Sequence, residues 1–413
     1  MEIENFINLN IKENYDKKTL FSKLSQLFCE RVEILAYDND NYTDYTNFYC
    51  LNLKQDVPNP APFEMACHGL IFNMQNKLVC WNLPNLYQID NKITGEIDTK
   101  ITDNITKWKE LYDGAVMRMF YDETNKKWIL TTTRQIDANV AKWNNTTNFA
   151  DLFKKYLYGS KNLTSEQKYI NFCKSLNTDY NYIFVLHIKE TCKYLKSKIK
   201  PKIIHVETYN IKKHEIVPFL KSDIESANEN TGEMVIKKEG IYEFVEPTKF
   251  YNFEKKENIK NKYNSDDVYG LIGLLSLNNV ICGYKLINDK VWKKIEYMSN
   301  NPNVSYNIVN NICRGKKEEF MTLYPELKND IIDLDLKISK SAKKIYEIYM
   351  KCFVSGRNNP SYKKEIGQWC KPVIFFMHDY YCGGNGKITY EVTKHLMMSL
   401  GAPVVASIIG INI

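Results

Sequence analysis

The spacing of apolar residues changes once along this chain, near residue 300. Before that point, short apolar runs alternate with turn residues, which is typical of strands and hairpins. After it, a single helical stripe consists of Ile331, Ile332, Leu334, Ile338, Ala342, Ile345, Ile348, Tyr349 and Cys352. The two patterns occupy separate blocks, so we expect an α+β fold with two domains. Antiparallel sheets flanked by helices are expected over residues 1–295, and an all-helical C-terminal domain over residues 296–413.

Turn residues divide the first block into strands. Gly69–Phe72 and Lys77–Trp81 flank an Asn-Met-Gln-Asn turn, and Ala115–Tyr121 and Trp128–Thr133 flank a turn at residues 122–125. Further strands are expected at Tyr182–His187, Lys202–Glu207, Met234–Lys237, Leu271–Leu277 and Val280–Leu286. Helices are expected at Lys18–Phe28, Phe149–Tyr158 and Ser165–Ser175.

The composition excludes several classes of protein. With 56 basic and 49 acidic residues, the net charge of +7 permits a polyanionic partner without requiring one. The 11 cysteines form no Cys-x-x-Cys pair and the 6 histidines no zinc-binding spacing, so no metal site is expected. Met1–Asn10 carries acids and lacks the apolar core of a secretory signal. We therefore expect a cytoplasmic, reducing environment in which the cysteines are small core residues.

The C-terminal stretch Leu396–Ile413 carries no charge and raises the question of a membrane anchor. Its small and polar residues weaken the hydropathy, and Pro403 interrupts it. We expect a final helix and strand packed on the core, with membrane attachment as the alternative.

The Asp113-Gly114 dipeptide lies in a longer run that suggests chemistry. The run from Glu110 to Tyr121, followed by Trp128–Ala138, resembles the nucleotide-binding motif and next strand of ATP-dependent RNA ligases. The similarity is to the phage tRNA-repair RNA ligase family of covalent nucleotidyltransferases. Other segments in matching order are Cys67–Phe72, Trp81–Gln88, Phe184–His187, Tyr269–Ile272, Tyr284-Lys285, Glu318–Pro325 and Trp369–Tyr381. This resemblance implies an RNA-ligase-like nucleotidyltransferase domain over residues 1–295.

The resemblance also implies a lysine nucleophile, which would attack the α-phosphate of ATP and pass AMP to an RNA 5′-phosphate. An amine attacks only when its pKa is lowered, and the phosphates need cations and a metal ion around them. In the Glu-Lys-x-Asp-Gly register the nucleophile position is Leu111, whose side chain has no lone pair. We therefore predict no catalytic residue there.

Other positions of the predicted pocket have changed as well. The positions of two phosphate-binding cations are occupied by His68 and Asn85, and those of two carboxylates by Val185 and Tyr269. The residues that match the family are Asp113, Gly114 and Lys285. A pocket built from this set lacks the charges that adenylyl transfer requires.

Two substitutes for the missing groups remain open. Lys109 would point to the same side of its strand as Leu111, about 6–7 Å away, and could serve as the nucleophile. A surface lysine is the alternative interpretation. Asp266 and Asp267 could supply a missing acid, although a solvated turn also explains them.

The sequence thus favours an RNA-ligase-like protein that binds RNA, such as ends or a tRNA-like hairpin, or acts as a scaffold for a protein partner. Its adenylyltransferase chemistry would be lost, and no cofactor would be needed. The RNA contacts are predicted at Arg118, Arg134 and Lys285. One alternative is an active RNA ligase that uses ATP and magnesium to join 5′-phosphate and 3′-hydroxyl ends; another is a structural or tail-anchored interaction protein. The abundance of Asn, Lys, Tyr and Ile hints at a viral or parasite genome.

Overall fold

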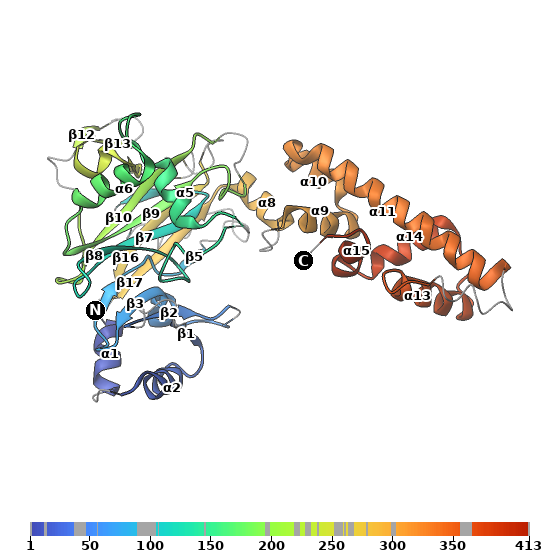
Figure 1. Cartoon of the computed structure of the whole chain (residues 1–413), viewed down its shortest axis with the longest axis horizontal. Coiled ribbons are helices and arrows are strands. Elements are labelled where there is room, and N and C mark those ends of the chain that lie inside the picture. The colour runs from blue at the N-terminus through green and yellow to red at the C-terminus, as the bar shows by residue number, and fades with distance from the viewer. Residues whose placement is uncertain are drawn as a thin grey trace. The chain divides into compact units, whose positions relative to one another are not determined.

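The computed structural model divides the chain into two compact units, Met1–Val291 and Trp292–Ile413 (Figure 1). The boundary expected between residues 295 and 296 falls inside helix α8 (Asp289–Tyr297). The structure describes residues 2–11, 15–36, 47–55, 57–88, 105, 107–143, 146–194, 199–218, 224–227, 233–237, 239–251, 259, 262, 268–277, 280–298, 303–355 and 366–411. Asp266 and Asp267 lie outside these residues.

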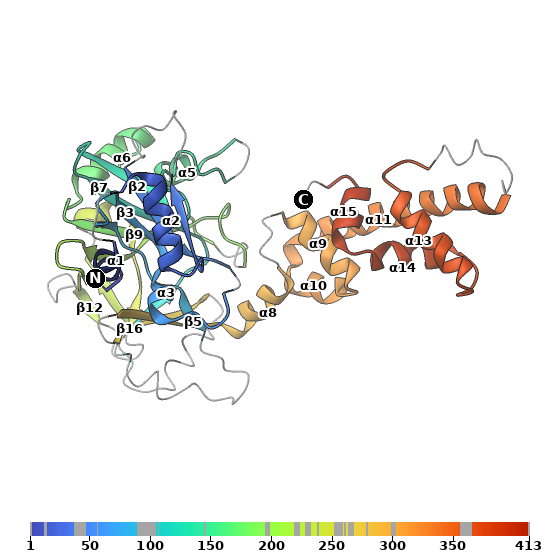
Figure 2. The ribbon, with the colours of Figure 1, turned by 90° about the horizontal axis from the view of Figure 1, so that it is seen from below.

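A four-stranded antiparallel sheet opens the first unit. Its strands follow the order β1 (Val32–Ala36), β2 (Phe48–Leu53), β3 (His68–Asn73) and β4 (Leu78–Cys80). Helices α1 (Glu2–Asn10) and α2 (Lys17–Leu27) lie beside this sheet (Figures 1 and 2), and their apolar residues pack against one of its faces. Asp16 caps α2 by accepting hydrogen bonds from two backbone N–H groups, which explains where that helix begins. A short helix, α3 (Pro62–Ala66), precedes β3.

A six-stranded sheet follows. Its order is β11 (Glu215–Ile216), β10 (Lys202–Asn210), β9 (Tyr180–His187), β7 (Ala115–Asp122) and β8 (Lys127–Thr132), with β14 (Glu246–Pro247) parallel to β10. Helices α5 (Phe149–Tyr156) and α6 (Ser165–Lys174) pack on one face through a cluster that includes Phe153, Phe172 and Phe184. Because side chains alternate along a strand, the neighbouring residues of β7 and β9 face the four-stranded sheet instead.

A seven-stranded sheet gathers strands that are far apart in the sequence. Its order is β12 (Ile224–Ala227), β13 (Glu233–Ile236), β15 (Phe250–Tyr251), β6 (Trp108–Leu111), β16 (Gly270–Leu277), β17 (Val280–Ile287) and β5 (Leu86–Gln88). Only β5 pairs in parallel, with β17, among the described strands of this sheet. One face is covered by an apolar cluster around Trp108, Tyr251 and Leu271. The 3₁₀ turn η4 (Gly240–Glu243) links β13 and β14.

The described elements of the second unit are helices. After α8 they are α9 (Val304–Cys313), α10 (Lys317–Leu323), η5 (Pro325–Leu327), α11 (Lys328–Tyr349), the π-helix η6 (Met350–Ser355), α13 (Lys371–Cys382), α14 (Tyr390–Ser399) and α15 (Ala402–Ile408). Most of the predicted stripe is the buried face of α11, but Ile332 is 40% exposed, Ile348 is half-buried and Cys352 lies in η6. The coarse prediction of an α+β fold with antiparallel sheets and a helical C-terminal part is therefore confirmed.

The prediction of a final strand near the C-terminus is wrong. The segment forms α15 instead, because Gly401 at a φ of 87° ends the preceding turn and Pro403 fixes a helical φ in the first turn. Val405 and Ala406 are buried in the unit. None of the described helices is long and apolar enough to cross a membrane. None of the 11 cysteines, all of which the structure describes, forms a disulfide, and Cys29 and Cys382 are exposed instead of lying in the core.

Candidate functional site

The Asp113-Gly114 dipeptide is the point where the chain crosses from one sheet to another. Strand β6 belongs to the seven-stranded sheet and ends at Leu111, whereas β7 begins at Ala115 in the six-stranded sheet. Gly114 has a φ of +152°, and a Cβ atom there would lie 2.5 Å from the Leu186 carbonyl oxygen. Only glycine fits a backbone this close to its neighbour. The dipeptide therefore has a structural role at the crossing.

Asp113 uses its polar atoms to hold the loop that follows β9. Its carboxylate accepts hydrogen bonds from the backbone N–H groups of Lys193 (2.9 Å) and Tyr194 (2.7 Å). Its carbonyl oxygen lies 2.6 Å from Nδ1 of His187, which donates to it. The Tyr194 ring stacks on Tyr269 with a centroid separation of 5.9 Å, which brings Tyr269 to the crossing.

The strand register places three predicted residues on one face of the seven-stranded sheet. Lys109 is opposite Ile272, which is opposite Lys285, and Leu111 is opposite Gly270. Residues directly opposite each other share a face, as do residues two apart on a strand. Lys109, Leu111 and Lys285 therefore project from the same face, which we call the cleft face.

Lys109 is bound by the six-stranded sheet. Its ammonium group forms an ion pair with the carboxylate of Glu207 on β10 and lies 3.3 Å from the carbonyl oxygen of Val206. The Glu207 side chain is 2% exposed, so the Lys109 ammonium group stands where water would otherwise contact the carboxylate. The amine that could have replaced Leu111 is thus held by an internal carboxylate.

Lys285 differs from Lys109 because it has no hydrogen bond or ion pair with the described residues. Burial lowers the pKa of its ammonium group. Burial is the main cause that lowers the pKa of His68 to about 4, and the positive charges of Arg118, Lys285 and Arg134 act in the same direction. His68 Nδ1 lies 2.9 Å from the Leu83 carbonyl oxygen and donates to it. A neutral histidine and a lysine without an acidic partner are therefore close enough to influence each other.

The three predicted RNA contacts lie in different surroundings. Arg118 is fully buried and donates to the carbonyl oxygens of Gly69 and, at 2.6 Å, Thr132, so its guanidinium joins two sheets and offers no surface to a nucleic acid. Arg134 is exposed and lines a hollow of about 250 Å³ with Glu33 and residues 35–36 and 135–136. Lys285 alone of the three projects from the cleft face.

Apolar side chains occupy the space beside the crossing. Val185, at a predicted carboxylate position, belongs to a buried cluster with Tyr112, Ile204 and Val206, against which Leu83 and Val116 pack. Asn85 precedes β5 and donates its backbone N–H to the Met65 carbonyl oxygen at 2.8 Å. Within the described ranges, no three His, Cys, Asp or Glu side chains are grouped so as to hold a metal ion.

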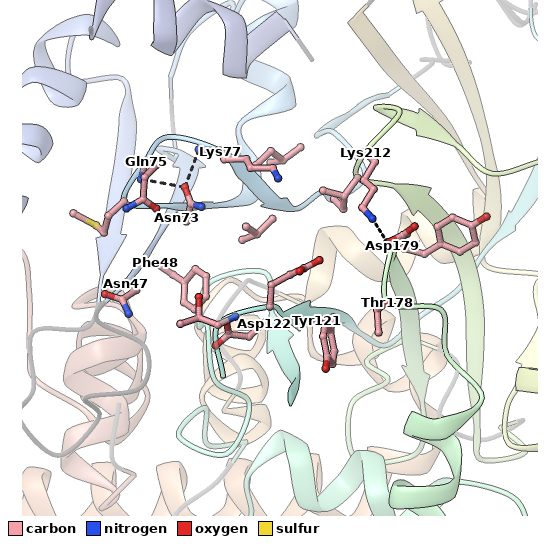
Figure 3. Close-up of a pocket in the computed structure, with 17 residues that line it drawn as sticks. Asn47, Phe48, Asn73, Gln75, Lys77, Tyr121, Asp122, Thr178, Asp179 and Lys212 are labelled. Carbon is pink, nitrogen blue, oxygen red and sulfur yellow. Dashed lines mark hydrogen bonds and ion pairs between the residues drawn. The ribbon is translucent and has the colours of Figure 1, made fainter. Parts of the chain in front are cut away.

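The sequence analysis missed a polar cavity of about 590 Å³ (Figure 3). Its walls come from four turns and the start of β2, namely residues 47–48, 73–75, 77–79, 121–124, 178–180 and 211–212. Two of these turns were predicted, at residues 73–76 and 122–125, but only as connections between strands. A second cavity of about 520 Å³ lies in the helical unit, beside η6 and α13, and includes Phe353 and His378.

Comparisons with known proteins give weak likenesses. No protein-family model matches the chain. A segment of 84 residues is 30% identical to the "Immediate-early protein ICP-46 homolog" of Invertebrate iridescent virus 3; it makes up 20% of this chain and 17% of that protein. The chain thus matches well under two thirds of that viral relative. A solved structure, the "Putative ATP-dependent DNA ligase from Aquifex aeolicus", is similar at a TM-score of 0.35 and 12% identity, over 77% of this chain and 70% of that chain. A likeness this weak assigns no family, and membership in the tRNA-repair ligases stays a prediction.

Proposed function

We propose that this protein binds RNA through a ligase-like fold that has lost adenylyl transfer. One observation supports the loss of chemistry: in the register that the resemblance implies, Leu111 takes the nucleophile position, and the nearest amine on its strand, that of Lys109, is paired with Glu207. A lysine nucleophile attacks through a free lone pair, and the ion pair holds the Lys109 ammonium group against Glu207 instead of at the position of Leu111.

Distance argues against the other amine of the cleft face. Lys285 lies on β17, two strands from Leu111 and two residues along from the position opposite it. Standard sheet spacings put the Cα atoms of Lys285 and Leu111 about 12 Å apart. In-line attack tolerates displacements far smaller than this. Lys285 therefore suits a contact with phosphate better than the role of the missing nucleophile.

Incubation with α-³²P-labelled ATP and magnesium tests the loss of chemistry. The wild-type chain should carry no acid-stable label after denaturing electrophoresis. The Lys109→Ala and Lys285→Ala variants serve as matched controls. A labelled wild-type band that disappears in either variant would show an active nucleophile and overturn this part of the proposal.

RNA binding is tested separately, by fluorescence anisotropy with a single-stranded RNA and with a tRNA-like hairpin. The affinity should fall as salt rises, by a factor of about 10 or more between about 50 and 200 mM for a few phosphate contacts. Lys285→Ala should weaken binding and reduce the salt dependence, whereas the exposed Lys174→Ala should change neither. No measurable affinity for either RNA at the lower salt would contradict the proposal.

A further inference from the structure

The second cavity, of about 520 Å³, lies within the helical unit and has a different lining from the polar one. Its walls come from the end of α11, the π-helix η6, the last turns of α13 and the segment that leads into α14. Both α13 and α14 contact α11 (Figure 1). The volume falls within the usual range for small-molecule sites, about 300–1,000 Å³, and π-helices are frequent at functional sites. We call this space the helical-unit cavity.

The floor of the helical-unit cavity is apolar. It is formed by three buried side chains, those of Tyr349, Cys352 and Ile388. The Phe353 ring lies against the His378 ring, with centroids 4.5 Å apart, so the imidazole packs as part of the wall. Moving apolar surface out of water onto such a floor is favourable, whereas a charged or amide group would lose its hydration there. The floor therefore suits the apolar part of a ligand.

The mouth of the helical-unit cavity carries a positive charge. Val354 and Tyr381 lie there at 49% and 46% exposed, beside the exposed Lys387. The Lys387 ammonium group forms no hydrogen bond or ion pair with the described residues. The described lining includes no Asp or Glu; Asp379 and Glu391, which are exposed on α13 and α14, are outside it. The charge at the mouth therefore favours an anionic group.

The chain that follows η6 has few residues suited to this floor. Residues 356–365 read Gly-Arg-Asn-Asn-Pro-Ser-Tyr-Lys-Lys-Glu, in which Tyr362 is the one large side chain with an extensive apolar surface. Four of the ten residues are charged and two are amides. Burying such groups on an apolar floor costs free energy. By composition, this segment is a poorer match to the floor than an apolar ligand is.

We propose that the helical-unit cavity binds an acyl chain that ends in an anionic group, with the chain on the apolar floor and the anion at Lys387. A lysine side chain suits this position because its stem lies along apolar surface while its ammonium group stays in water. Two sources offer this chemistry, a free fatty acid and an anionic phospholipid of a membrane. The proposal concerns the helical unit and does not rest on RNA binding.

Titration of the full chain with dansyl-labelled undecanoic acid tests the cavity, because the dansyl fluorescence rises in an apolar site. Val354→Trp adds a large ring at the mouth and should weaken binding about tenfold or more. Its matched control is Leu336→Trp, at a leucine of α11 that is 54% exposed and outside the lining. Both substitutions are at exposed positions, where the fold tolerates change.

The charge at the mouth is tested with a second pair of variants. Lys387→Ala should weaken binding of the same probe about threefold to tenfold, as expected for a partly exposed ion pair. Lys340→Ala, at an exposed lysine of α11 outside the lining, should change it less than about twofold. Decanoate should displace the probe better than decanol, which has the same chain without the charge. Equal displacement by the two would overturn the assignment of an anionic group to Lys387.

Vesicles identify the source of the ligand. Co-sedimentation with phosphatidylcholine vesicles that contain phosphatidylglycerol, lost in Val354→Trp and Lys387→Ala, would assign the phospholipid. Saturable binding of the soluble probe without co-sedimentation would assign the free fatty acid.

Three results would overturn the inference. The first is a wild-type chain that binds neither the probe nor the vesicles, and the second is probe binding that Val354→Trp leaves unchanged. The third is binding that appears only in Tyr362→Ala, which would show that the chain's own segment fills the cavity. RNA affinity is measured in parallel and should be the same in all these variants, so a failure here leaves the proposed function standing.

Discussion

The cleft face of the seven-stranded sheet and the turn-lined cavity use their polar groups in opposite ways. At the cleft, the residues that resemble a catalytic motif are bound internally: Lys109 to Glu207, and Asp113 to two backbone N–H groups. At the cavity, Asn73, Gln75 and Lys77 belong to no motif, yet they keep donors available. The residues that resemble a motif are thus used to hold the fold together, whereas the turns around the cavity keep hydrogen-bonding groups available.

The largest effect is expected from the Lys109–Glu207 ion pair. Glu207→Gln should lower the free energy of unfolding by about 3 kcal/mol, because it leaves the ammonium group of Lys109 in a largely buried position without its counter-charge. Urea denaturation measures this change. Glu215→Gln, which breaks an exposed pair with Lys213, should change stability little. If the two variants are equally mild, the pair does not hold Lys109 and the contrast with the cavity fails.

The crossing at Gly114 should tolerate no side chain. Gly114→Ala places a Cβ atom 2.5 Å from the Leu186 carbonyl oxygen, whereas Gly240→Ala meets nothing within 4 Å. Both glycines have positive φ values, but side chains adopt the +152° of Gly114 less readily than the +59° of Gly240, so the difference reports the close contact and the backbone strain together. We expect Gly114→Ala to cost about 2 kcal/mol more than Gly240→Ala in urea denaturation. Equal costs would show that the chain can shift here, and that Asp113 is not rigidly placed.

Acidification should destabilise the six-stranded sheet through His205. Burial lowers the pKa of His205 to about 3, so the folded state stays neutral where the unfolded state takes up a proton. Above the ordinary histidine pKa of about 6.5, His205 therefore does not lower the free energy of unfolding. Below that pH, its contribution makes the free energy of unfolding fall by about 1.4 kcal/mol per pH unit. Comparing unfolding at several pH values for the wild type and His205→Gln measures this slope, with the exposed His395→Gln as control. A slope that His205→Gln leaves unchanged would assign the acid sensitivity to other groups.

The smallest effect is expected at the cavity. Lys77→Ala and Gln75→Ala remove exposed side chains that form no hydrogen bond or ion pair with described residues. Each should change the free energy of unfolding by less than about 0.5 kcal/mol. Thermal or urea denaturation is sufficient to check this. Losses above about 1 kcal/mol would mean that these groups stabilise the fold and are not left available.

Local sequence patterns predicted the helices and strands better than the contacts that those elements make with one another. The β7–β8 hairpin follows from apolar runs around a turn, and α11 from a continuous stripe, because both depend on residues close in sequence. The Lys109–Glu207 pair joins residues 98 positions apart and depends on two different sheets. No spacing rule reveals such a contact. The cavity was missed for the same reason, since four turns with no shared motif form its walls.

The interleaved order of the seven-stranded sheet has a consequence for how the chain folds. Strand β6 pairs with β15, which begins at Phe250, and with β16, which begins at Gly270. Until the ribosome has made these residues, the β6 backbone therefore lacks both neighbouring strands. The four-stranded sheet, in contrast, joins strands that are consecutive in the chain and can close first. Long-range pairing of this kind slows folding because a long loop must close before any contact rewards it. Fragments that stop before Phe250 should therefore leave β6 without either neighbouring strand and prone to aggregate, while the N-terminal sheet is already assembled.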